Sequence, residues 1–160
     1  MKKKIISMCF TLILFLSLLI AEATNAKAST DIPVVDGSYL TYNNESIGYA
    51  TKIARGVDLL NGYSKVVRLG PGCIYAGGTT VAAQTVKKVK IAVLVERIQQ
   101  EGDSWEYYAN WAKENEDSNR VSANRELKVD GNYYYRVRCT HSANNDVSSS
   151  FTDGIFIEEP

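Results

Sequence analysis

The chain is poor in the side chains on which most catalytic and metal sites depend. Its 160 residues include one histidine, His141, and three cysteines. A nucleophilic Ser-His or Cys-His site would have to use His141, and no Gly-flanked nucleophile turn lies near it. Zinc sites favour close pairs of Cys or His ligands, and the sequence has none. We therefore expect no enzyme activity, no bound metal and no cofactor.

The chain also lacks an excess of either charge, since 18 basic residues stand against 18 acidic ones. No segment gathers lysine and arginine into a basic patch, and removal of residues 1–28 would leave the chain mildly acidic. Binding to nucleic acid depends on neutralising phosphates with basic side chains. The composition therefore argues against nucleic acid as a partner.

The N-terminus has the layout of a secretory signal. Three lysines, Lys2 to Lys4, precede an apolar run from Ile5 to Ile20, as expected of a positive region followed by a hydrophobic one. Ala26 and Ala28 have the small-residue spacing of a cleavage site. An uncleaved anchor is the alternative, but the run is shorter than the ~20 residues that a spanning helix needs. We expect residues 1–28 to be a signal peptide, cleaved after Ala28, and the remaining chain to be secreted and extracellular, not embedded in a membrane.

Two regions follow the signal. Residues 29–54 show no sustained hydrophobic period and predict a weakly structured lead-in, whereas residues 55–160 alternate like β-strands. The clearest strand is Lys87–Ile98, in which Val89, Ile91, Val93 and Val95 occupy every second position. A two-residue period with β-branched residues on one side is typical of a half-buried strand.

Turn signals divide the rest of this region into short segments. They are Asn61-Gly62, Gly70-Pro71-Gly72, Gly77-Gly78, Glu101-Gly102-Asp103, Asp130-Gly131 and Asn144-Asn145-Asp146. Residues 104–113 fit a strand or a helix, and their aromatic content favours the strand; residues 114–119 predict a polar loop. About eight short strands joined by tight turns predict an all-β fold, an antiparallel β-sandwich.

Two cysteines follow the predicted signal, Cys73 and Cys139. In an oxidising compartment they could form one disulfide, which would close a long loop. Sequence spacing does not show whether the two sulfur atoms meet. Two buried free thiols are the alternative.

The aromatic residues suggest a binding surface. Consecutive strand residues point to opposite faces, so Tyr134 cannot share a face with Tyr133 and Tyr135, nor Tyr108 with Tyr107. Some rings must therefore lie on a solvent face or at a sheet edge, where they can stack on sugars or receive a protein. We name Trp105, Tyr108, Trp111 and Tyr134 as candidate binding residues. The alternative is that these rings form cross-strand pairs that stabilise the sheet.

Several stretches carry a resemblance to known proteins. They are residues 64–70, 76–82 and 93–97, Trp105, residues 131–138, His141 and residues 150–155. Together they resemble a family of small secreted proteins of Gram-positive bacteria that is classed as a domain of unknown function. The segment Tyr134–Val137, followed by the turn at 144–146, resembles the penultimate strand of fibronectin type III domains. These resemblances imply secretion and an immunoglobulin-like or fibronectin III-like sandwich over residues 55–160, but no activity.

Taken together, these patterns predict a secreted, non-enzymatic β-domain that binds a cell-surface glycan or a protein. Two alternatives stay open at this point. One is a small secreted hydrolase that uses His141 or a pair of acids, and the other is a secreted toxin or antimicrobial factor.

Overall fold

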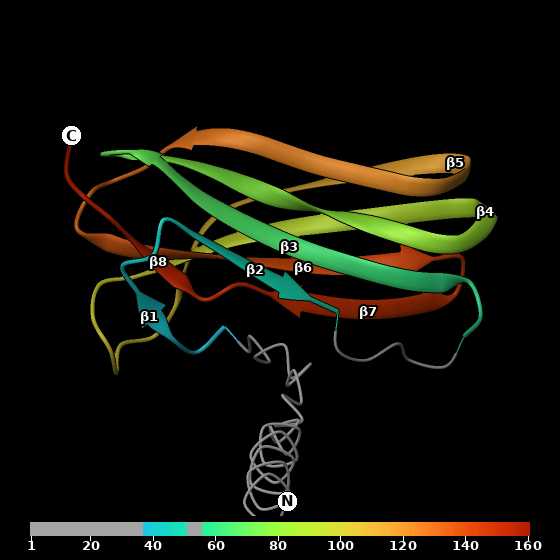
Figure 1. The fold of residues 1–160 in the computed structure, drawn as a ribbon, viewed down its shortest axis with the longest axis horizontal. Helices are drawn as coiled ribbons and strands as arrows, with labels where there is room; N and C mark the ends of the chain where they lie inside the picture. The colour runs from blue at the N-terminus through green and yellow to red at the C-terminus, as the bar shows by residue number, and fades with distance from the viewer. Residues whose placement is uncertain (1–36, 51–55) are drawn as a thin grey trace, which may run out of the picture. The chain divides into compact units, whose positions relative to one another are not determined.

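The computed structural model describes residues 37–50 and 56–160, and these residues form an all-β domain without a helix (Figure 1). Its strands are β1 (Leu40–Thr41), β2 (Glu45–Tyr49), β3 (Leu59–Gly70), β4 (Cys73–Ile98), β5 (Glu106–Lys128), β6 (Tyr133–Ala143), β7 (Asp146–Phe151) and β8 (Gly154–Ile157). Nothing in this part of the chain is a helix capable of crossing a membrane. The predicted signal peptide 1–28 and its cleavage after Ala28 lie outside the described residues.

All eight strands belong to one mixed sheet. Its order is β1-β8-β6-β4-β3-β2, with β5 beside β4 and β7 beside β6. Neighbouring strands run antiparallel except β1 and β8, which are parallel. The predicted all-β fold is confirmed, but the hydrogen bonds run through one sheet rather than through two separate ones. The strands are also not all short, since β4 has 26 residues and β5 has 23.

The sheet curls because β4 and β5 bend together. They remain paired along both lengths, with a register shift between Val81 and Val86 of β4. Next to this shift, Asp117 of β5 has a left-handed φ of 45°. Beyond the bend the chain returns, so that the Thr80 hydroxyl donates to the Lys90 carbonyl at 3.1 Å. Figure 1 shows both strands turning at the same end of the domain, which brings the two halves of the sheet face to face.

The hydrophobic core lies between these facing halves. Val66 and Ile74 enter it from β3 and the first half of β4, and Ile91, Val93 and Val137 enter it from the second half of β4 and from β6. These five side chains are at most 1% exposed. The alternation predicted for Lys87–Ile98 is therefore confirmed, and it fixes which side chains of this half point away from the core.

Three of the predicted breaks are wrong. Asn61-Gly62 lies within β3, Gly77-Gly78 within β4, and residues 114–119 within β5. The glycines are present because neighbouring atoms lie close to the backbone: a Cβ on Gly62 would be 2.4 Å from Cγ of His141, and one on Gly78 would be 2.9 Å from Sγ of Cys139. Glycine in a strand often marks such a close approach. The turns at Pro71-Gly72 and Asn144-Asn145 are confirmed.

The lead-in is also partly corrected. Strands β1 and β2 lie inside residues 29–54, so the prediction of weak structure is wrong for these two stretches. In the pairing of β2 with β3, Ser46 lies opposite Val66. The Ser46 hydroxyl also accepts the backbone N–H of Asp153 at 3.0 Å. These contacts attach β2 to the rest of the domain.

Candidate binding site

The outer face of β4, β5 and β6 carries one continuous set of outward side chains. Because Ile91, Val93 and Val95 point into the core, Ala92 and Leu94 point outward. The pairing places Ala112 of β5 and Thr140 of β6 on either side of Ala92. It likewise places Asn110 and Arg138 on either side of Leu94. Two cross-strand rows thus lie next to each other on this face.

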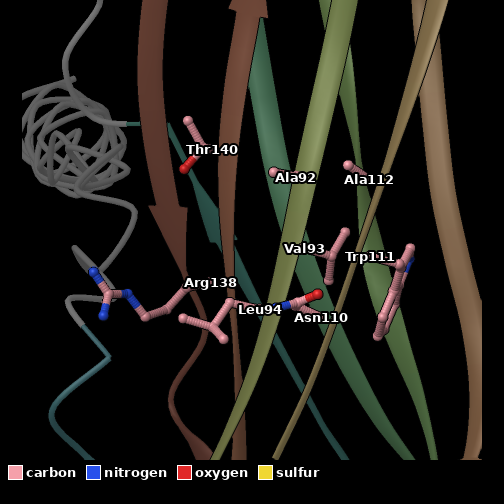
Figure 2. A pocket seen from close by; sticks show the side chains of 8 residues that line it. All are labelled: Ala92, Val93, Leu94, Asn110, Trp111, Ala112, Arg138 and Thr140. Atoms are coloured by element: carbon pink, nitrogen blue, oxygen red, sulfur yellow. The ribbon is translucent and has the colours of Figure 1, made fainter. Parts of the chain in front are cut away.

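These rows border a hollow of about 370 Å³, here called the β4–β5–β6 hollow. Figure 2 shows Leu94, Asn110, Arg138 and Thr140 on one side of the strands and Trp111 and Val93 on the other. The two alanines, Ala92 and Ala112, leave space where larger side chains would fill the surface. The hollow therefore combines a small apolar floor with polar groups at its border.

A trio of charged residues lies beside the hollow. Glu96 is only 9% exposed, and its carboxylate accepts from Nε of Arg136 at 2.8 Å and from Nη1 of Arg138 at 3.3 Å. The side chain of Arg138 is 42% exposed, against 14% for Arg136. One carboxylate stands against two guanidinium groups, so the trio has a net positive charge, and its exposed part is at Arg138.

The guanidinium groups of both arginines stack on aromatic rings. The guanidinium of Arg136 lies 4.0 Å from the ring centre of Trp105, and that of Arg138 lies 5.0 Å from the ring centre of Phe151. Arg136 also donates to the Gly37 carbonyl at 2.6 Å. Because these contacts restrict the side chains, Arg138 presents its charge at a defined place next to Leu94.

The four candidate aromatic residues do not form one surface. Trp105 lies under Arg136, and Tyr134 packs with Tyr42 and Phe156, with ring centres 5.9 and 5.1 Å away. A hydrogen bond with Tyr42 raises the pKa of Tyr134 to about 12. These rings lie on the same outer face as Arg136, but they are partly covered by their neighbours.

The other two candidates, Tyr108 and Trp111, pack against the core. The Tyr108 hydroxyl donates to the Lys128 carbonyl at 3.0 Å, and the guanidinium of Arg125 lies 5.0 Å from the Trp111 ring. Nε1 of Trp111 is buried and has no hydrogen-bond partner among the described residues. For these two rings the contacts match the alternative reading, in which aromatic residues stabilise the sheet.

Of the four candidate binding residues, Trp111 is in the lining of the hollow, and sequence reasoning missed the other lining residues. Leu94, Asn110, Arg138 and Thr140 are ordinary residue types in strand patterns, and no motif distinguishes them. The alternation in β4 could have identified two of the lining residues, because it places Ala92 and Leu94 on the face of the strand that points away from the core. What the alternation did not show is which residues of β5 and β6 lie next to them.

His141 lies inside the core rather than in a cleft. It is fully buried, and burial lowers its pKa to about 4. Its Nδ1 lies 2.8 Å from the Thr80 hydroxyl and its Nε2 lies 2.8 Å from the Ser150 hydroxyl. Since Thr80 donates its only hydroxyl proton to Lys90, Nδ1–H donates to Thr80 and Nε2 accepts from Ser150. The ring is thus fully satisfied by two buried hydroxyls.

Comparison with protein families, with curated proteins and with solved structures gives no similarity on which an identity could rest. The resemblance to a secreted family and to fibronectin type III strands therefore stays a prediction, and function has to be argued from the site.

The remaining candidate residues are the cysteines and the possible metal ligands. Cys73 is partly exposed, Cys139 is buried, and both are free thiols. Burial raises the pKa of Cys139 to about 12, and its Sγ lies 3.8 Å from the Gly77 carbonyl. Within residues 37–50 and 56–160 no three His, Cys, Asp or Glu side chains gather to hold a metal ion.

Proposed function

We propose that this protein is a secreted, non-enzymatic domain that binds a cell-surface glycan in the β4–β5–β6 hollow. The observation that carries the proposal is the exposed guanidinium of Arg138 at the border of a hollow of about 370 Å³. A concave, largely apolar site with a few fixed polar groups is the usual form of a small-ligand site. The two halves of the curled sheet would supply the layers of the predicted sandwich.

Size favours a glycan over a protein as the ligand. Stable protein–protein interfaces bury about 800 Å² on each partner, which is far more than this hollow offers. A sugar ring could place an apolar face on Ala92 and Leu94 while its substituents reach Asn110 and Thr140. The net positive charge of the Glu96 trio favours a sugar that carries a carboxylate, because Arg138 can bind it through two N–H groups.

The state of His141 supports a non-enzymatic role. A general base must reach its substrate directly or through one water molecule. His141 and its partner Ser150 are 0% and 1% exposed, so a substrate would have to enter a close-packed core. No specific observation favours a toxin.

A binding assay on immobilised uronic-acid-containing and neutral glycans tests the proposal. We expect Arg138→Gln and Leu94→Asp to weaken binding to the acidic glycans about tenfold or more, which corresponds to about 1.4 kcal/mol. Arg120→Gln is the matched control, because Arg120 is an exposed arginine of β5 outside the hollow. Absence of glycan binding, together with capture of a cell-surface protein, would show that the ligand is a protein.

A further inference from the structure

The other half of the curled sheet has its own outer face, formed by β3 and the first half of β4. Val66, Ile74 and Ala76 are buried, so Lys65, Val67 and Tyr75 point away from the core. The pairing places Val67 opposite Tyr75, Lys65 opposite Gly77, and Tyr63 opposite Thr79. This face belongs to the opposite side of the core from the β4–β5–β6 hollow.

A hollow of about 450 Å³ lies on this face, here called the β3–β4 hollow. Its lining residues are Tyr63, Lys65, Val67, Leu69 and Tyr75. Gly77 has no side chain to fill the space opposite Lys65, and the Oδ1 of Asn124 would lie 2.4 Å from a Cβ at that position. The amide of Asn124 therefore lies close over the backbone of Gly77, beside the hollow.

Three residues with polar side-chain ends, Tyr63, Lys65 and Tyr75, line this hollow together. The pKa of Tyr75 is raised by burial and by the nearby phenol of Tyr63, and lowered by the charge of Lys65. The Tyr63 hydroxyl is held by the hydroxyl of Thr79 at 3.1 Å. Its ring also packs at 6.3 Å from that of Tyr49, which is 46% exposed.

The charge of Lys65 is already balanced. Its ammonium group lies 2.8 Å from the carboxylate of Glu45 on β2. The β3–β4 hollow thus offers tyrosine rings, an apolar floor at Val67 and hydrogen-bonding groups, but no net positive charge. This differs from the Glu96 trio, which keeps an excess of one positive charge.

We propose that the β3–β4 hollow is a second binding site, and that its ligand is a neutral sugar chain. Tyrosine rings offer flat surfaces to the C–H faces of sugar rings, and their hydroxyls, with Lys65 and Asn124, can exchange hydrogen bonds with sugar hydroxyls. The balanced charge of Lys65 disfavours an anionic ligand. This site is independent of Arg138 and of the function proposed above.

Titration of ¹⁵N-labelled protein with neutral tetrasaccharides tests the second site. The probes are cellotetraose, xylotetraose and chitotetraose, at up to roughly 10 mM so that a Kd near 1 mM would be seen. We expect at least one of them to shift the amide signals of residues 63–69 and 75–77. Loss of one stacked ring in Tyr75→Ala should raise that Kd about fivefold or more. Lys65→Gln, which keeps most of the side-chain length, should also weaken binding.

Tyr107→Ala is the matched control, because Tyr107 is a 63% exposed tyrosine of β5 outside the β3–β4 hollow. It should leave the Kd unchanged, and so should Arg138→Gln. The proposal is overturned if no probe shifts these signals, or if Tyr75→Ala and Lys65→Gln proteins with native spectra bind as well as the wild type. Binding of neutral sugar that depends on Arg138 and not on Tyr75 would place that sugar in the β4–β5–β6 hollow instead.

Discussion

The imidazole of His141 occupies the space in which a side chain at position 62 would lie. A Cβ on Gly62 would be 2.4 Å from Cγ of His141 and 2.6 Å from its Cδ2 and Nδ1. Gly62 belongs to β3 and His141 to β6, which lie in the two facing halves of the sheet. The absence of a side chain at one position therefore makes room for a buried polar side chain at the other.

Gly62→Ala should destabilise the protein because the added methyl group would force the His141 ring to move. Overpacking of this kind costs about 1–3 kcal/mol, which exceeds the gain of up to about 1 kcal/mol from a less flexible unfolded chain. Urea unfolding measures the difference. Leu60→Ala is the control, since Leu60 is 59% exposed and its loss should change stability by less than about 0.5 kcal/mol. Equal midpoints for Gly62→Ala and wild type would contradict the expected clash.

His141 should make the folded state sensitive to mild acid. Its pKa is about 4 in the folded protein and about 6.5 when unfolded. Above pH 6.5 both states are neutral, so stability does not depend on this group. As the pH falls from 6.5 to 4 only the unfolded state binds the proton, and up to about 3 kcal/mol of stability is lost.

Urea unfolding of wild type and His141→Gln between pH 7.5 and 4 isolates this contribution, because the carboxylates are common to both proteins. We expect the wild type to be more stable at pH 7.5 and its advantage to shrink as the pH falls. A difference that stays constant across this range would mean that the pKa of His141 is not lowered in the folded state.

The alternating strand Lys87–Ile98 was predictable from sequence because a period of two is a local property. It needs only the fact that Val89, Ile91, Val93 and Val95 share one face. The opposite faces of Tyr107 and Tyr108 follow from the same rule, and the structure has Tyr107 63% exposed and Tyr108 packed against the core. Patterns of this kind identified most of the β-structure correctly.

The bend of β4 and β5 was not predictable in the same way. Glycine permits a turn, but it also permits another part of the chain to pack against the backbone. At Gly62, Gly77 and Gly78 the glycine allows such close packing rather than a turn. Which of the two applies depends on residues such as His141, which lies far along the sequence. The stretch 114–119 looked like a loop because its own side chains are almost all polar, although its partners in β4 include the buried Val86 and Val89. Polarity alone does not separate an exposed strand from a loop.

The two proposed binding hollows were not predictable for a related reason. Each depends on cross-strand neighbours: Ala92 needs Ala112 and Thr140 beside it, and Lys65 needs Gly77. A single sequence gives the face of each residue but not the register between strands. Among the aromatic candidates in residues 105–111, Trp111 is in the lining of the β4–β5–β6 hollow, whereas Tyr63 and Tyr75 of the β3–β4 hollow were not named as candidates.

Glu96→Gln should destabilise the protein because it leaves two arginines without their shared anion. Loss of one partner from a fully buried ion pair costs about 3–5 kcal/mol. Because Arg138 is 42% exposed and partly solvated, we expect about 2 kcal/mol. Glu114→Gln is the control: its pair with Lys88 at 2.9 Å is exposed and should contribute less than about 1 kcal/mol. Similar losses for the two variants in urea unfolding would contradict a special role for Glu96.

Cys139 should be protected from alkylation for as long as the domain stays folded. The residue is 2% exposed and burial raises the pKa of its thiol to about 12, so the reactive thiolate is scarce at neutral pH. Cys73, at the start of β4, is partly exposed. In a Cys9→Ser protein, we expect iodoacetamide to modify Cys73 first and Cys139 only after urea is added. Intact mass measures the number of groups added, and peptide mapping identifies the site. If the protein takes up no label in urea until it is reduced, Cys73 and Cys139 form a disulfide. That result would contradict the assignment of both cysteines as free thiols.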